Sequence, residues 1–247
     1  MNTIMVTIRL LGGIVLFIYG MKIMGDGLEN AAGEGLKNIL EKVTKNPIIA
    51  VVVGAIVTAV IQSSSATTVM VVGFVNAGLM NLAQAAGIIM GANIGTTITA
   101  QLVAFKLTDI APLFVFVGAM IVMFAKMQKK KEIGNIILGF GILFIGMGMM
   151  SDAMKPLRES VIFQQVLLTI ADKWYLGVIA GALVTAVLQS SSATTGILVA
   201  LANAGAISIA GALPIVLGCN IGTCITAMLS TVGTNKTAHR AAMMHLI

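Results

Sequence analysis

The sequence has 247 residues, of which 58% are hydrophobic and 10% charged, and its formal net charge is +6. Soluble domains are about half apolar and about one-quarter charged, so this composition excludes an ordinary soluble domain and favours a polytopic membrane protein. The basic excess does not indicate nucleic-acid binding, because the Lys and Arg residues cluster at the ends of apolar segments.

The first half alternates between apolar runs and polar interruptions. An apolar helix is expected at about 8–25, where the Gly-rich stretch indicates close helix packing, and a polar connector follows at 26–46. Two apolar arms then flank the heptad QSSSATT at 62–68. Neither arm reaches the roughly twenty residues that a spanning helix needs, which suggests a re-entrant helical hairpin. One long broken span through the same residues is the competing geometry.

Two further apolar segments complete the first half, at about 82–103 and 111–125. The former carries the motif G-x-NIGT in its second half. Glycines inside this motif, Gly95 and its later counterpart Gly222, would let the backbone unwind beside the asparagines. We therefore expect an interrupted helix at this point of the chain.

The second half repeats the first at an offset of 127 residues. VTAVIQSSSATT at 57–68 pairs with VTAVLQSSSATT at 184–195, and GANIGTTITA at 91–100 pairs with GCNIGTCITA at 218–227. A fixed internal period of this kind indicates a duplicated structural unit. A second polar connector, matching the first, is expected at 152–173. The chain is therefore divided into a first transmembrane repeat, 1–127, and a second, 128–247, which ends before its last helix is complete.

With three crossings in the first repeat, the second repeat would lie inverted in the membrane. If the basic linker at 126–131 is cytoplasmic, ten of the 15 Lys and Arg residues lie inside, which favours an external N-terminus. Inverted repeats with polar breaks at matching positions are typical of secondary transporters. The expected fold class is an all-α polytopic membrane protein of two inverted-topology repeats, each with a re-entrant helical hairpin and an interrupted helix.

The heptads are suited to bind an anion. Irregular backbone survives in hydrocarbon only against a cavity, and a helix N-terminus at a hairpin tip presents N–H groups with partial positive charge. Such a terminus binds anions without Lys or Arg, and serine hydroxyls add donors. The predicted phosphate-binding residues are Ser63, Ser64, Ser65, Ser190, Ser191 and Ser192.

The same segments are suited to Na⁺, a hard cation that prefers oxygen ligands from hydroxyls, amides and carbonyls. An anion next to a cation also lowers the cost of burying either charge. Which hydroxyls contact phosphate and which contact sodium stays open. The predicted sodium-binding residues are Gln62, Thr67, Thr68, Asn93, Thr96, Gln189, Thr194, Thr195, Asn220 and Thr223.

Enzymatic and other metal chemistry is not expected. A serine nucleophile needs a base within reach, and neither heptad region contains His, Asp, Glu or Lys. Cys219 and Cys224 have no third ligand nearby for a zinc site, and no cofactor is expected. Asp26 and Asp152 occur at equivalent helix ends and are interpreted as interfacial caps instead of ion ligands.

The paired QSSSATT heptads, each followed by G-x-NIGT, resemble the type II sodium/phosphate cotransporter family in its bacterial branch. The resemblance covers residues 10 to about 242. It implies Na⁺-coupled uptake or exchange of inorganic phosphate by alternating access, at a site where the two QSSS motifs meet. It also implies a multi-pass protein of the bacterial plasma (inner) membrane. A homodimer and a PhoU-like cytoplasmic segment in the parent protein are further expectations.

The sequence departs from the family in one respect. Electrogenic animal members carry an Asp soon after the first QSSS motif, whereas here no acidic residue occurs between Glu41 and Asp109. Stoichiometry and electrogenicity therefore stay open, and the sequence does not determine the direction of net flux. The alternatives are a Na⁺-coupled carrier of sulfate, arsenate or a carboxylate, and a membrane sensor that binds phosphate without moving it.

Overall fold

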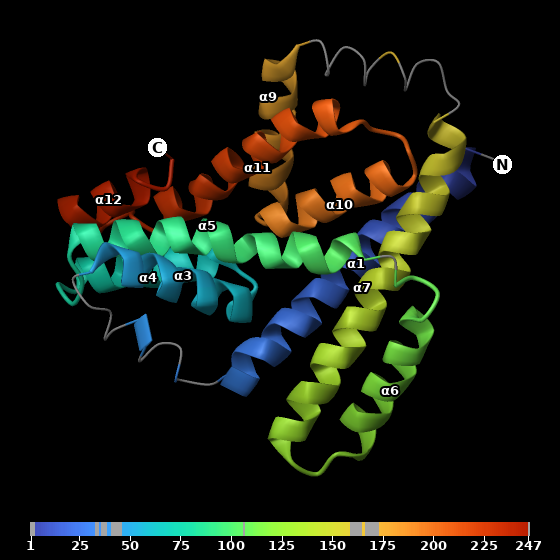
Figure 1. The fold of residues 1–247 in the computed structure, drawn as a ribbon, viewed down its shortest axis with the longest axis horizontal. Helices are drawn as coiled ribbons and strands as arrows, with labels where there is room; N and C mark the ends of the chain where they lie inside the picture. Colours follow the sequence, from blue (N-terminus) through green and yellow to red (C-terminus); the bar gives the residue numbers. More distant parts are fainter. Residues whose placement is uncertain are drawn as a thin grey trace.

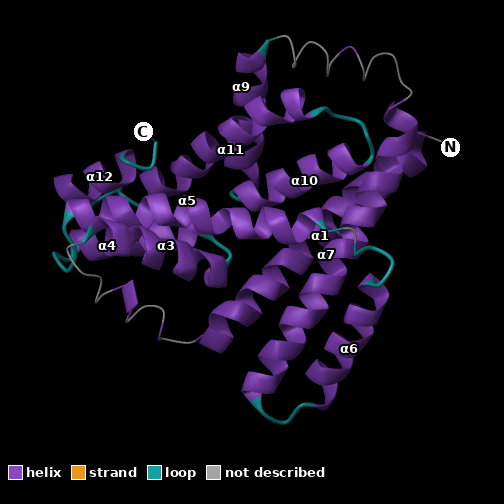
Figure 2. Cartoon of the chain, in the orientation of Figure 1, coloured by secondary structure: helices purple, strands orange, loops and turns teal. Residues whose placement is uncertain are grey.

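The computed structural model describes residues 3–32, 35, 39–40, 46–105, 107–158, 165 and 173–246. Within these residues every regular element with assigned bounds is an α-helix (Figure 2). The helices are α1 (Thr3–Ala32), α3 (Pro47–Ile61), α4 (Ser64–Asn76), α5 (Leu82–Ala104), α6 (Ala111–Phe124), α7 (Gln128–Arg158), α9 (Trp174–Leu188), α10 (Ser191–Asn203), α11 (Ile209–Leu229) and α12 (Lys236–Met243).

The long helices α1 and α7 run side by side, and α6 packs on α7 (Figure 1). The close approach of α1 and α7 depends on glycines on both helices. A Cβ added to Gly20 would lie 2.7 Å from the carbonyl oxygen of Gly139, and one added to Gly146 would lie 2.6 Å from that of Gly13. Small residues let membrane helices approach backbone to backbone, so the Gly-rich segment of α1 serves packing, as expected.

The two sequence repeats form equivalent helices. Helices α3 and α9 have 15 residues each, and α4 and α10 have 13 each. In one copy α3 packs on α5, and in the other α9 packs on α11. At both interfaces a glycine sits against a backbone carbonyl: Gly91 faces Val51 and Gly218 faces Val178.

The expected interruption of the G-x-NIGT helices is wrong. Helices α5 and α11 continue without a break through Gly95 and Gly222. A Cβ on Gly95 would clash with the carbonyl oxygen of Ala55, and one on Gly222 with that of Ala182. These glycines therefore allow close packing on α3 and α9, and they do not unwind the backbone.

Four helices within the described residues are long and apolar enough to cross a membrane: Ile4–Ala32, Leu82–Ala104, Gln128–Pro156 and Ile209–Leu229. The chain is therefore a multi-pass membrane protein. Helix α6 has 14 residues, fewer than the roughly twenty that a crossing needs. The third crossing of the first repeat is not supported by helix length, and the inverted arrangement stays a prediction.

Helices α1 and α7 extend further than expected. Asp26 and Asp152 each lie six residues before the last residue of their helix, so their interpretation as caps at helix ends is wrong. The helix continues past Asp26 and packs on α7 at Gly27, where an added Cβ would lie 3.0 Å from the Glu132 carbonyl oxygen. Much of the connectors 26–46 and 152–173 lies outside the described residues.

Candidate functional site

Each heptad begins at a sharp break between two helices, and the break is only two residues long. Gln62 ends α3 in the left-handed conformation, with φ of 60°, and Ser63 is extended. Gln189 and Ser190 adopt the same conformations in the second copy, with φ of 55° at Gln189. A left-handed residue other than glycine costs about 1–2 kcal/mol. The remainder of each heptad is helical, so the polar break is much shorter than the heptad.

The two glutamine side chains stabilise these breaks. The Thr99 hydroxyl donates to Gln62 Oε1 at 2.6 Å, and the Gln62 amide donates to the Ala59 carbonyl. In the second copy the Thr226 hydroxyl donates to Gln189 Oε1. The breaks are thereby attached to α5 and α11. Sequence reasoning missed both threonines, although they occupy matching positions at the ends of the repeated G-x-NIGT segments.

A second set of hydrogen bonds joins the two arms of each break. The Thr58 hydroxyl donates to Thr67 Oγ1 at 2.9 Å, and the Thr67 hydroxyl donates to the Ser63 carbonyl at 3.1 Å. Thr185 and Thr194 form the same 2.9 Å bond in the second copy. Thr67 and Thr194, both predicted sodium ligands, therefore take part in bonds between the arms.

The N-termini of α4 and α10 are capped by serine. Ser63 Oγ accepts from the Ala66 N–H and Ser190 Oγ from the Ala193 N–H, both at 3.1 Å. The first N–H groups of a helix have no partner within it, and they concentrate partial positive charge. Two such helix N-termini follow the two breaks directly.

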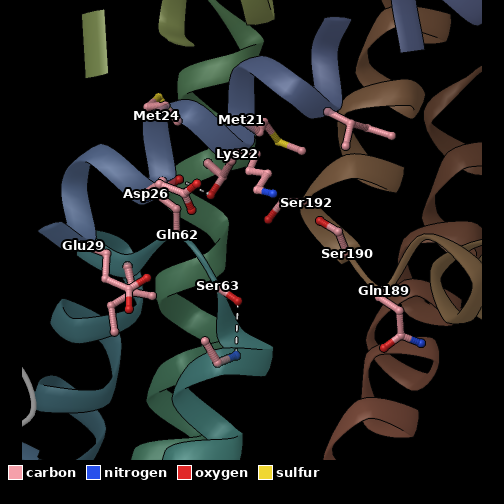
Figure 3. A pocket seen from close by; sticks show the side chains of 15 residues that line it. Met21, Lys22, Met24, Asp26, Glu29, Gln62, Ser63, Gln189, Ser190 and Ser192 are labelled. Carbon is pink, nitrogen blue, oxygen red and sulfur yellow. Dashed lines mark hydrogen bonds between the residues drawn. The ribbon is translucent and has the colours of Figure 1, made fainter. Parts of the chain in front are cut away.

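Both breaks line one cavity of about 310 Å³. Figure 3 shows residues of the two breaks on opposite sides of this cavity, with α1 crossing above them. The cavity brings together five of the sequence-predicted site residues: Gln62, Ser63, Gln189, Ser190 and Ser192. Thr99 and Ala66 line it as well. The two QSSS motifs, 127 residues apart in sequence, thus meet in space.

The other predicted phosphate ligands do not line the cavity. Ser64 and Ser191 are buried as the first residues of α4 and α10, and Ser65 is half-buried in the first turn of α4. The side chains of these three serines are therefore not in position to bind an anion inside the cavity. Their backbone N–H groups belong to the two helix N-termini described above.

The remaining predicted sodium ligands are spread over three helices. The hydroxyls of Thr96 and Thr223 donate to the carbonyls one turn back, of Ala92 and Cys219, which is common for threonine in membrane helices. Thr195 is half-buried in α10, and Asn220 is exposed on α11. None of these four lines the cavity.

Asn93 and Thr68 have distinct surroundings. The Nε2 atom of His245 lies 3.1 Å from Asn93 Oδ1, and burial lowers the pKa of His245, which favours its neutral form. The Thr68 hydroxyl is fully buried and has no hydrogen-bond partner within the described part of the chain. Thr68 is therefore a predicted ligand whose oxygen is not already engaged.

Three charged residues of α1 line the same cavity: Lys22, Asp26 and Glu29. Their spacing of four and three residues places them on one face of the helix. Sequence reasoning did not assign them to the site because they lie far from both heptads in the sequence. Asp26 was interpreted as a cap, although its helical spacing from Lys22 and Glu29 was a usable signal.

A protein-family model described as Na⁺/Pi-cotransporter matches residues 16–152 and 149–247. YqeW of Bacillus subtilis (strain 168), an uncharacterised protein, is 32% identical over 234 residues, which cover 95% of this chain and 76% of YqeW. YjbB of Escherichia coli (strain K12), named as a proposed inorganic phosphate export protein, is 30% identical over 240 residues. These residues cover 97% of this chain but only 44% of YjbB, so the chain spans less than half of that relative.

A shorter match extends to an animal protein. The sodium-dependent phosphate transport protein 2A of Rattus norvegicus is 36% identical over 97 residues, which cover 38% of this chain and 15% of that protein. No solved structure is significantly similar to the chain.

Proposed function

The chain belongs to the Na⁺/Pi-cotransporter family, a family of transporters and not of enzymes, and on that premise we propose that it carries inorganic phosphate across the membrane in a Na⁺-coupled cycle. The observation that carries the proposal is the single cavity lined by both QSSS motifs. Two duplicated helix breaks that meet at one cavity are the arrangement expected of a repeat transporter site. The names of relatives that include phosphate transport support the same substrate.

In the proposed site, hydroxyls and helix N-termini bind the phosphate from two sides. Ser63, Ser190 and Ser192 line the cavity, and the hydroxyl of each can donate to a phosphate oxygen. The N-termini of α4 and α10 add N–H donors that are already oriented by the capped first turns. Because both breaks contribute, neither repeat binds the anion alone.

Sodium is proposed to bind through neutral oxygens near the same breaks. Gln62 and Gln189 line the cavity, and each side-chain carbonyl accepts one hydrogen bond, which leaves a second lone pair. Thr68 supplies a buried hydroxyl oxygen without a partner in the described chain. Na⁺ beside the phosphate would offset the cost of desolvating either ion.

The transport cycle is proposed to be alternating access between two inverted repeats, with α3–α4 and α9–α10 as the re-entrant hairpins and Na⁺ binding first. The bacterial plasma membrane is proposed as the location, a proposal supported by the bacterial relatives that match nearly the whole chain. A coupled carrier moves its substrate in the direction that the gradients set, so the export named for YjbB is compatible with this site. The homodimer and the PhoU-like segment stay predictions.

Uptake of radiolabelled phosphate by proteoliposomes tests the proposal. An inward Na⁺ gradient is expected to drive accumulation, whereas K⁺ is not, and Li⁺ and excess sulfate define selectivity for the cation and the anion. Uptake that is indifferent to Na⁺ would contradict the coupling. Phosphate binding without any flux would instead support a sensor.

Replacing Thr68 by valine separates a ligand role from a packing role. Because the buried hydroxyl has no partner, Thr68→Val is expected to leave the thermal unfolding midpoint unchanged or raised. The Na⁺ concentration for half-maximal uptake is expected to rise several-fold, since one oxygen ligand is lost. Thr58→Val is the control, because it breaks the bond to Thr67 and costs about 1 kcal/mol of stability. An unchanged Na⁺ dependence in Thr68→Val would remove Thr68 from the sodium site.

A further inference from the structure

Lys22 is an exposed charged residue within α1, a helix long and apolar enough to span a membrane. The candidate span runs from Ile4 to Ala32, and Lys22 lies four residues, or about 6 Å along the helix axis, beyond its middle residue. The hydrocarbon core extends about 15 Å to either side of its midplane. A charge inside a membrane span is costly, and such residues characteristically face a protein interior or a water-filled cavity.

Lys22 faces the cavity that the two QSSS breaks form. It lines this cavity together with Ser190 and Ser192, and Figure 3 shows its amine directed toward Ser192. Asp26 and Glu29 line the same wall, yet Lys22 has no ion pair with any acid in the described part of the chain. Its ammonium group is therefore available to a ligand in the cavity.

The second repeat has no lysine at the matching position. MKIMGD at 21–26 corresponds to MGMMSD at 147–152, at an offset of 126, one residue less than that of the heptads, so the counterpart of Lys22 is Gly148, whereas Asp26 has a counterpart in Asp152. Gly148 lines a different cavity, with Asp109 and Asp152, away from the QSSS breaks. Helix α7 therefore forms its packing contacts without a lysine at this position. The lysine is present only in α1, the copy that faces both breaks.

We propose that Lys22 binds the phosphate anion directly and supplies the positive charge that stabilises the anion in the site. This inference rests on the proposed phosphate site. All other predicted phosphate donors are neutral hydroxyls and N–H groups, while Asp26 and Glu29 on the same wall would repel an anion. An ammonium group supplies three donors and a full charge, and its charge-assisted hydrogen bonds are about twice as strong as neutral ones.

Equilibrium binding of radiolabelled inorganic phosphate to the purified full chain, in saturating Na⁺, tests this role. Lys22→Met and Lys22→Gln are expected to weaken binding about ten-fold or more, which is the effect of losing one charge-assisted hydrogen bond. Lys22→Arg is expected to restore most of the affinity. The half-saturating Na⁺ concentration should change less than about two-fold. Inhibition by sulfate should weaken in parallel in Lys22→Met and Lys22→Gln.

The matched control is Lys155→Met. Lys155 lies on α7, pairs with Asp152 at 2.8 Å and lines the other cavity, so phosphate binding should be unchanged. Unchanged phosphate affinity in folded Lys22→Gln or Lys22→Met would overturn the inference while leaving the proposed transport function intact. A wild-type chain that binds phosphate but does not transport it would overturn the function and not the role of Lys22. Absence of phosphate binding to the wild-type chain would overturn both.

Discussion

Phosphate uptake is expected to fall at least about a hundred-fold when Ser63 and Ser190 are both replaced by glycine. Each substitution removes a hydroxyl from the cavity, and a hydrogen bond to a charged group contributes about 1.5–3 kcal/mol. Two such losses, one from each break, correspond to a hundred-fold or more in affinity. Glycine is chosen because it replaces serine at a helix N-cap at a cost of only a few tenths of a kcal/mol. The initial rate of uptake at low phosphate measures the effect.

The control for this variant is Ser208→Gly. Ser208 caps α11 by accepting from the Gly211 N–H, as Ser63 and Ser190 cap their helices, but it does not line the cavity. Uptake by this control should stay within about two-fold of wild type. The single variants Ser63→Gly and Ser190→Gly should each lose about ten-fold. Near-normal uptake by the folded double variant would exclude these hydroxyls from the phosphate site.

Gly91→Ala is expected to destabilise the protein by about 1–3 kcal/mol, even though it adds a single methyl group to a helix. A Cβ at this position would clash with the Val51 carbonyl oxygen on α3, and backbone cannot rotate away as a side chain can. Separating α3 from α5 would also displace Gln62 from Thr99, so transport should fall with stability. The thermal unfolding midpoint of the purified protein measures the change.

Gly73→Ala is the matched control, because Gly73 also lies within a helix but an added Cβ would meet nothing within 4 Å. Alanine in a helix interior is about 0.5–1 kcal/mol more favourable than glycine, so this variant should be equally or more stable than wild type. Gly218→Ala should reproduce the loss in the second copy, at its contact with Val178. If Gly91→Ala were as stable as Gly73→Ala, the close backbone approach of α3 to α5 at Gly91 would be contradicted.

Sequence patterns were sufficient for much of the helix arrangement. Hydrophobic runs bounded by polar residues predicted α5 and α6 to within a residue at each end, and the offset of 127 predicted equivalent partners for α3, α4 and α5. Patterns failed where packing decided the outcome. Gly95 was expected to unwind a helix, yet glycine is equally compatible with close packing, and only the position of α3 distinguishes the two. Asp26 looked like a helix end because the apolar run stops there, although the helix continues.

The candidate site was predicted only in part, because its lining also depends on how the helices pack in three dimensions. Duplication indicated that the two QSSS motifs lie together, and Ser63 and Ser190 line one cavity, while their role as phosphate ligands stays a prediction. The contribution of Lys22 could not be predicted, because it depends on how α1 crosses the two breaks in space (Figure 3). Likewise, no pattern in the sequence separates Ser192, which lines the cavity, from its buried neighbour Ser191.

The position of a bound anion tests the central claim most directly. Crystals of the full chain grown with Na⁺ and arsenate, a heavier tetrahedral analogue of phosphate, would locate the anion by the anomalous signal of arsenic. A peak between the two breaks, within hydrogen-bond distance of both Ser63 and Ser190, is the predicted result. A peak beside one break alone, or in the separate cavity lined by Asp109 and Asp152, would contradict a phosphate site shared by the two repeats.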